Sequence, residues 1–250
     1  MRFGLFRVCL FLFMGSTVPI FFSGCAHIAD LKHSKEGNAL NLSRKGLNEF
    51  PEEAFENKEL RVLRLYGNNI DSIPDRISEL TQLEKLYLGR NDLKYVPSSI
   101  GELKNLKILQ VQYNEIESLP EELGQLESLE QLWLNQNKLR KLPESLGDLK
   151  NLEVLQVKFN QLDSLPNSIG ECERLKFIHL NRNNLVKLPK SMAKLSNLKE
   201  LYLSGAGPLL DVPEEMCDLR YFELIQIDNS TALPACMYVL QANRLQIIRE

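Results

Sequence analysis

The chain has 250 residues, of which 44% are apolar, 25% charged and 8% aromatic, so it is long and apolar enough to form a sizeable core, which excludes a compositionally disordered chain. Thirty Lys and Arg against 33 Asp and Glu give a net charge of −3, which excludes a nucleic-acid binder that depends on bulk positive charge. A polyanionic partner would need a local basic patch.

The first 24 residues differ from the rest of the chain. Arg2 and Arg7 are their only charged residues, and the run from Val8 to Phe22 is almost wholly apolar. A charged start followed by a short apolar run is typical of an export signal, and this run is shorter than the roughly 20 residues that a spanning helix needs. We predict a signal peptide over residues 1–24, with an uncleaved anchor as the alternative.

The apolar run ends in Phe22-Ser23-Gly24-Cys25, which resembles the lipobox of bacterial lipoproteins, although Phe22 stands where that box usually has Leu. The resemblance implies that Cys25 is lipidated and that the protein lies at the cell envelope. The residue after the cysteine is Ala26 and not Asp, which resembles the pattern of lipoproteins sorted to an outer membrane or cell surface. The alternative is an ordinary signal peptide in which Cys25 has no role. Residues 25–37 would form a tether or a short N-terminal cap.

A repeat fills most of the remaining chain. Seven prolines follow one another at steps of 23 residues, and Pro213 and Pro234 continue the series at 24 and 21. The regular prolines are Pro51, Pro74, Pro97, Pro120, Pro143, Pro166 and Pro189. An asparagine stands six residues before each of these prolines except the first, at Asn68, Asn91, Asn114, Asn137, Asn160 and Asn183. A fixed step of this kind is the signature of a solenoid.

Each repeat predicts one coil. Leu63 and Leu65 alternate with other residues, which places both leucines on one face of a short strand. Pro74 then prevents further strand pairing, and the Ile77-x-x-Leu80-x-x-Leu83 spacing predicts a helical or 3-10 return turn. The apolar side chains buried by one coil cannot offset the conformational entropy that its residues lose on folding. The coils must therefore stack, with their strands parallel.

The unit over residues 132–152 resembles the leucine-rich repeat family, in the 23-residue class with Leu-Pro and Ile/Leu-Gly-x-Leu in the return segment. The resemblance covers residues 38–234 and implies a right-handed α/β solenoid of about nine coils. It implies parallel strands on the concave face and short helical or 3-10 return segments. It also implies that the six periodic asparagines are buried and bond the backbone of their own and the neighbouring coil, and we call them the ladder asparagines. Residues 235–250 are expected to form a C-terminal cap, as a helix or a strand.

Three cysteines fall within the repeat array and its end. Cys172 occupies a position that other coils fill with Leu, so we expect it in the core. Cys217 and Cys236 lie in comparable return segments of adjacent coils, and an exported protein permits a disulfide between them. Two buried thiols are the alternative.

The sequence contains few residues that could form a catalytic site. His27 and His33 lie in the tether, His179 is the only histidine of the array, and the sequence has no phosphate loop, His-x-x-His pair or nucleophile elbow. The carboxylates of the return segments are expected to be solvated. We predict no enzymatic activity, no cofactor and no metal site.

The strand alternation identifies the side chains that line the concave face, which we expect to have no role in specifying the fold. The lining positions include four basic residues, Arg64, Arg90, Lys158 and Arg182, and one acidic residue, Asp228. The concave face is therefore predicted to be basic. Aromatic side chains zigzag along it, and exposed aromatics among arginines are typical of binding hot spots. The candidate binding residues are Arg64, Tyr66, Tyr87, Arg90, Tyr113, Trp133, Lys158, Phe159, His179, Arg182 and Tyr202. Inherited repetition without a ligand is the alternative.

These observations predict a monomeric, non-catalytic module, anchored by lipid at the bacterial cell envelope, whose concave face binds a protein with an acidic surface or an anionic glycan. No nucleic-acid partner is expected. One alternative is a structural or adhesive envelope protein. The other is an intracellular scaffold of the Ras-pathway type, which would require residues 1–24 to be retained.

Overall fold

The strands form one sheet in chain order. The computed structural model describes residues 35–208 and 210–250, so the predicted signal peptide, Cys25 and most of the tether lie outside the described residues. Strand β1 (Lys35–Glu36) pairs antiparallel with β2, and all later neighbours are parallel. The parallel strands are β2 (Ala39–Asn41), β3 (Val62–Arg64), β4 (Lys85–Tyr87), β5 (Ile108–Gln110), β6 (Gln131–Trp133), β7 (Val154–Gln156), β8 (Phe177–His179), β9 (Glu200–Tyr202), β10 (Leu224–Ile227) and β11 (Gln246–Arg249).

The strand register follows the sequence repeat. Leu63 pairs with Leu86 and Arg64 pairs with Tyr87, so equivalent residues of successive coils lie side by side. The middle residue of each regular strand is buried and its two neighbours are partly exposed, as the alternation predicts. The strands from β2 to β11 bound nine coils within the described part of the chain.

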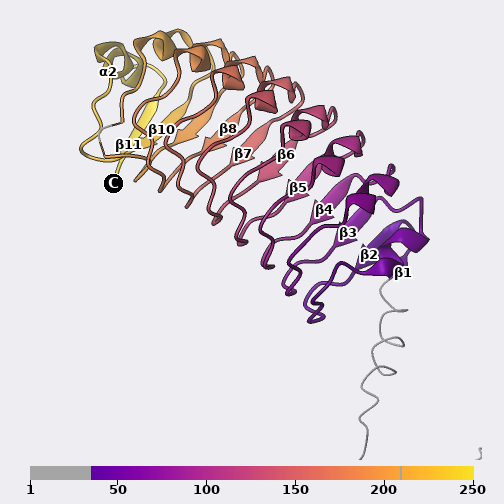
Figure 1. Cartoon of the computed structure of the whole chain (residues 1–250). Helices are drawn as coiled ribbons and strands as arrows, with labels where there is room; N and C mark the ends of the chain where they lie inside the picture. Colours follow the sequence, from indigo (N-terminus) through magenta and orange to yellow (C-terminus); the bar gives the residue numbers. More distant parts are fainter. Residues whose placement is uncertain (1–34, 209) are drawn as a thin grey trace, which may run out of the picture. The chain divides into compact units, whose positions relative to one another are not determined.

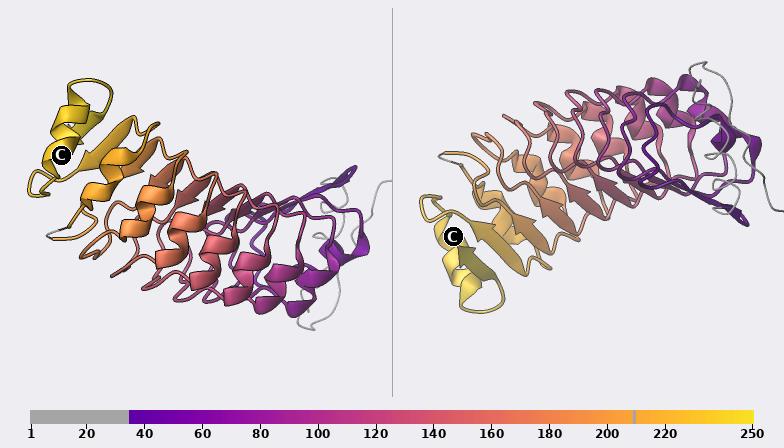
Figure 2. Two further views of the ribbon diagram at one scale, coloured as in Figure 1. Left: turned by 90° about the horizontal axis from the view of Figure 1, so that it is seen from above. Right: turned by 90° about the horizontal axis from the view of Figure 1, so that it is seen from below.

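A 3-10 helix follows each proline of the regular series and Pro213. In every case the proline is the residue before the helix, where its restricted φ suits the start of a turn. The helices form a row along one edge of the coil stack, and the strands form a second row (Figures 1 and 2). They are η2 (Glu52–Glu56), η3 (Asp75–Glu79), η4 (Ser98–Glu102), η5 (Glu121–Gln125), η6 (Glu144–Asp148), η7 (Asn167–Glu171), η8 (Lys190–Lys194) and η9 (Glu214–Asp218). The predicted strands and return segments are confirmed.

The return helices of the central coils pack with backbone against backbone. A Cβ atom on Gly124 would lie 2.4 Å from the carbonyl oxygen of Ser145, and one on Gly147 would lie 2.5 Å from that of Ser168. A side chain at either position would push neighbouring coils apart. The periodic glycines of the return segments therefore set the close approach of one coil to the next.

The core is a continuous stack of leucine, isoleucine and valine side chains, nearly all of them fully buried. Cys172 lies within it, and its thiol donates to the carbonyl oxygen of Leu146 at 3.2 Å. Burial raises the pKa of this thiol to about 12, which keeps it protonated and unreactive. The prediction that Cys172 is a core residue is confirmed.

The C-terminal end contains both a helix and a strand. Helix α2 (Ala235–Gln241) begins after Pro234, and β11 then pairs parallel to β10. A disulfide joins Cys217 of η9 to Cys236 of α2, with 6.1 Å between the Cα atoms. Of the two possibilities that the sequence left open for these cysteines, the structure contains the disulfide.

Candidate functional site

The exposed side of the sheet is built from four residues of each coil, which we call the strand face. These are the first and third residues of the strand and the two residues that end its exit turn, such as Val62, Arg64, Tyr66 and Gly67. The register repeats this pattern, so each position forms a column across the coils. All eleven predicted binding residues fall on the strand face. It also includes two cations that sequence reasoning missed, Arg44 and Lys85.

The last column of the strand face has an unusual backbone. From Arg44 to Gly205 its residues have φ between 53° and 73°, in the left-handed region that favours glycine. Gly67 and Gly205 occupy two of these positions, whereas the other six carry side chains: Arg44, Arg90, Tyr113, Gln136, Phe159 and Arg182. The backbone of this column makes the turn out of strands β2 to β9, and the coil imposes the left-handed conformation on six residues whose types do not favour it.

Arginine and tyrosine side chains associate across the first four coils. The guanidinium of Arg64 lies 5.4 Å from the ring centre of Tyr87, and that of Arg90 lies 5.0 Å from the ring centre of Tyr113. Further along, the guanidinium of Arg182 lies 5.5 Å from the ring centre of Phe159. These are cation–π distances, and the contacts orient long cationic side chains that would otherwise be mobile.

The middle of the strand face is polar around Trp133. Gln112 is buried and lies over Gly89, where an added Cβ would be 2.9 Å from the Gln112 amide nitrogen. Asn135 donates to Gln156 Oε1 at 2.8 Å and accepts from the backbone N–H of Lys158 at 2.8 Å. Glycine at position 89 thus makes room for a side chain from the next coil.

A groove with a volume of about 640 Å³ lies at the C-terminal part of the strand face, lined among others by Lys158, Phe159, His179, Arg182 and Tyr202. The imidazole of His179 stacks on the Tyr202 ring, and the Tyr202 hydroxyl donates to a Glu200 carboxylate oxygen at 2.7 Å. That hydrogen bond, followed by burial, raises the pKa of Tyr202 to about 12. Five of the predicted binding residues therefore meet around one groove.

The ladder asparagines connect neighbouring coils. The Asn91 amide donates to the carbonyl oxygens of Leu88 in its own coil and Leu65 in the preceding coil, at 2.9 and 3.0 Å. Its side-chain oxygen accepts from the backbone N–H of Ile70 at 3.1 Å. Equivalent bonds involve Asn68, Asn114, Asn137, Asn160 and Asn183.

The ladder ends at Ala206. There the backbone N–H of Leu185 donates to the carbonyl oxygen of Ala206 at 2.6 Å, so a backbone group replaces the missing side chain.

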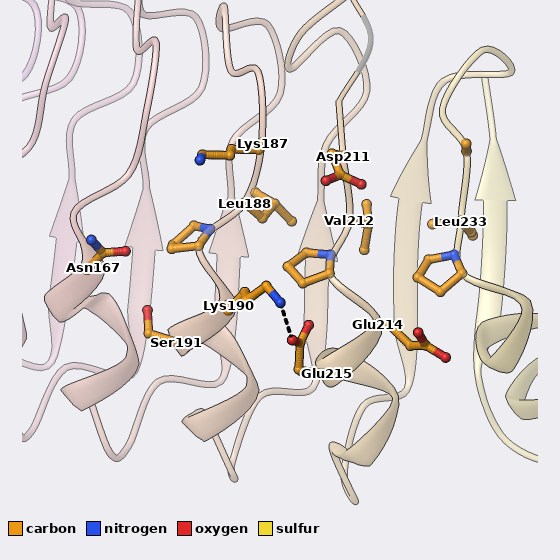
Figure 3. Close-up of a pocket in the computed structure, with 14 residues that line it drawn as sticks. Asn167, Lys187, Leu188, Lys190, Ser191, Asp211, Val212, Glu214, Glu215 and Leu233 are labelled. Atoms are coloured by element: carbon orange, nitrogen blue, oxygen red, sulfur yellow. Dashed lines mark hydrogen bonds and ion pairs between the residues drawn. The ribbon is translucent and has the colours of Figure 1, made fainter.

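A second groove, which sequence reasoning missed, lies away from the strand face. It has a volume of about 790 Å³ and lies beside the prolines of the last three repeats (Figure 3). Lys190 and Glu215 form an ion pair there at 2.6 Å. The signal in the sequence was the irregular step around Pro213, where the proline spacing changes from 23 to 24 and then to 21.

Within residues 35–208 and 210–250, no group of three or more His, Cys, Asp or Glu side chains could hold a metal ion. None of the helices in this part of the chain is long and apolar enough to cross a bilayer.

The chain matches a family model described as leucine-rich repeat region over residues 40–166 and 132–229. A leucine-rich repeat protein of Leptospira interrogans is similar in structure, with 27% identity, a TM-score of 0.77 and coverage of 89% of this chain. This chain spans 63% of the Leptospira chain. A search of curated proteins by sequence gives no match.

Two further structures are similar. The ectodomain of the plant receptor kinase GASSHO1/SCHENGEN3 from Arabidopsis thaliana, solved with CASPARIAN STRIP INTEGRITY FACTOR 2, is 30% identical with a TM-score of 0.62, over 72% of this chain and 22% of the plant chain. An internalin of Listeria monocytogenes is 18% identical with a TM-score of 0.72, over 87% of this chain and 62% of that one, and supports the fold alone. The matched repeats, together with the observed coils, show that the chain belongs to the leucine-rich repeat family.

Proposed function

We propose that the protein is a monomeric, non-catalytic recognition module that binds a protein on its strand face, the predicted concave face. The observation that carries this proposal is the presence of exposed aromatic rings at left-handed positions. Tyr113 and Phe159 are 45% and 46% exposed, although glycine would suit their backbone better. Large exposed rings beside arginines are the composition of binding hot spots.

The similar structures support binding in general. Leucine-rich repeat domains commonly bind proteins, and the Arabidopsis ectodomain was solved in complex with a partner. For this chain, the test is capture of partners from envelope extracts by the wild type and by a Trp133→Ala, Tyr87→Ala variant. A Tyr95→Ala, Tyr221→Ala variant is the matched control, because these tyrosines are 52% and 58% exposed and lie off the strand face.

We expect a partner that is captured by the wild type and the control variant and is lost with the strand-face variant. Equal capture by all three proteins would contradict the proposal. Thermal unfolding of each variant distinguishes lost binding from lost folding.

We also propose that Cys25 is lipidated and that the protein is anchored at the outer membrane or cell surface. The support is the charged and apolar start of the chain together with Ser23-Gly24-Cys25. Mass spectrometry of the native N-terminus tests this proposal. An acylated Cys25 is expected, whereas a chain that begins at Met1 would contradict it.

A further inference from the structure

Positive charge accumulates on the strand face without negative charge to balance it. From Ala39 to Arg182 the strand-face positions include no carboxylate, and the first of them, Glu200, lies in the coil that begins at β9. The cations in this stretch are Arg44, Arg64, Lys85, Arg90, Lys158 and Arg182. Four of the six lie in the first three coils.

Those four cations have no ion-pair partner among the described residues, although ion pairs are common elsewhere on the chain. Arg61 and Lys107, which each lie one residue before a strand, both pair with Glu84 at 3.0 and 3.1 Å. Lys138 pairs with Glu115 at 3.1 Å. The strand face from Ala39 to Arg182 differs from these parts of the surface because it has cations and no carboxylate among its positions.

Tyrosine rings hold the guanidinium groups in place. Tyr66 is flanked by Arg44 of the preceding coil and Arg90 of the following coil, at 5.8 and 6.0 Å from the ring centre. Arg90 also lies over Tyr113, and Arg64 lies over Tyr87. These contacts restrict the motion of the guanidinium groups, and the orientation of a side chain before binding lowers the entropic cost of association.

This geometry favours carboxylates over sugars. A sugar ring binds an aromatic side chain by stacking on an open ring face, but two guanidinium groups already lie over the Tyr66 ring. The planar arginine fork matches a carboxylate with two parallel hydrogen bonds. We propose that the cluster of Arg44, Arg64, Lys85 and Arg90 with Tyr66, Tyr87 and Tyr113, which we call the basic cluster, binds an acidic, Asp/Glu-rich segment of a protein. This inference rests on the proposed function of the strand face.

The experiment measures binding of a fluorescent peptide of alternating Glu and Ser, about ten residues long, to the full chain in detergent. The test variant is Arg44→Gln, Arg64→Gln, Arg90→Gln. Its control is Lys94→Gln, Arg140→Gln, Arg174→Gln, which removes the same charge from exposed positions off the strand face. We expect the test variant to weaken binding by about tenfold or more, and the control by about twofold at most.

A charge exchange keeps the test decisive if the Gln variant folds poorly. An Arg64→Glu, Arg90→Glu variant should lose the Glu peptide and bind a matched Lys-Ser peptide more tightly than the wild type does. Absence of Glu-peptide binding to the wild type, or equal losses in the test and control variants, would overturn the proposal. Tighter binding of a chondroitin sulfate oligosaccharide than of the peptide at the same arginines would overturn the assignment to a protein segment.

The two proposals can fail separately. If the captured partner is lost with Trp133→Ala, Tyr87→Ala but is retained by the triple Gln variant, the strand face binds a protein and the basic cluster is not its acidic-segment site. If neither variant changes capture, both proposals are wrong.

Discussion

The rings of His179 and Tyr202 lie parallel, with centroids 4.3 Å apart and 4° between their planes. They occupy the same column in adjacent coils, where paired strands bring equivalent side chains within contact. Burial, followed by the positive charge of Lys158, lowers the pKa of His179 from 6.5 to about 4, although Glu200 acts in the opposite direction. The imidazole is therefore neutral at physiological pH.

This stack predicts a dependence of stability on pH. In the unfolded chain His179 has its ordinary pKa and binds a proton below about pH 6.5, whereas in the folded chain it binds a proton only below about pH 4. The unfolded state therefore binds more protons between these pH values, and His179 destabilises the fold as the pH falls from 6.5 to about 4. The loss should be about 1 kcal/mol, since the ring is partly exposed and solvent screens it. A His179→Gln variant should lose less stability than the wild type between these pH values. An NMR titration of the His179 ring with a midpoint near 6.5 would be the contrary result.

The second prediction concerns the asparagine ladder. The Asn137 amide donates to the carbonyl oxygens of Val111 and Leu134, and its side-chain oxygen accepts from Ile116 N–H, all at 3.0 Å. Asn137→Ala leaves these buried groups unsatisfied and should lower the free energy of unfolding by about 3 kcal/mol. Asn69→Ala, at an exposed neighbour of a ladder position, should change it by less than about 0.5 kcal/mol. Denaturant unfolding measures the free energy of unfolding of both variants. A loss for Asn137→Ala as small as that expected for Asn69→Ala would contradict the prediction.

The third prediction concerns backbone strain in the left-handed column and compares glycine substitutions at two glutamines. Gln136 has φ of 53°, whereas Gln110 lies in strand β5. Gln136→Gly should stabilise the protein by up to about 1 kcal/mol by relieving the backbone, and Gln110→Gly should destabilise it by about 1 kcal/mol. Thermal or denaturant unfolding would reveal the opposite signs. Equal destabilisation by both substitutions would argue against strain at position 136.

The disulfide should stabilise the C-terminal end. Cys217 and Cys236 are 19 residues apart, and a crosslink over a loop of this length contributes about 3 kcal/mol by restricting the unfolded chain. Reduction should accelerate hydrogen exchange in α2 and β11 while β4 to β7 remain protected, since repeat arrays can unfold locally. A Cys217→Ser, Cys236→Ser variant should show the same exchange with and without reductant. Unchanged exchange on reduction of the wild type would contradict this prediction.

The regular part of the fold was predictable because one step of 23 residues fixes the strand, the turn and the return helix together. The buried position of Cys172 followed from the same step. The left-handed column was not predictable, because Arg90, Tyr113 and Phe159 are not residue types that favour positive φ. Only Gly67 and Gly205 signalled that backbone conformation.

The missed cations have separate causes. The first coil has Lys45 where later coils have a ladder asparagine, and the columns of the strand face were predicted only from the second coil onward, which left out Arg44. Lys85 is the first residue of its strand, and alternation places it on the same face as Tyr87. The arginine–tyrosine contacts depend on side-chain rotamers, which residue spacing does not specify.

Because cations line the strand face from Arg44 to Arg182 while Glu200 and Asp228 stand in the coils beyond, the surface has an electrical polarity along the axis of the stack. An extended partner with charges unevenly distributed along its own length would have one favourable head-to-tail direction. The reversed direction would place like charges opposite each other. The array can thereby distinguish a sequence from its reverse even where the two offer the same side chains.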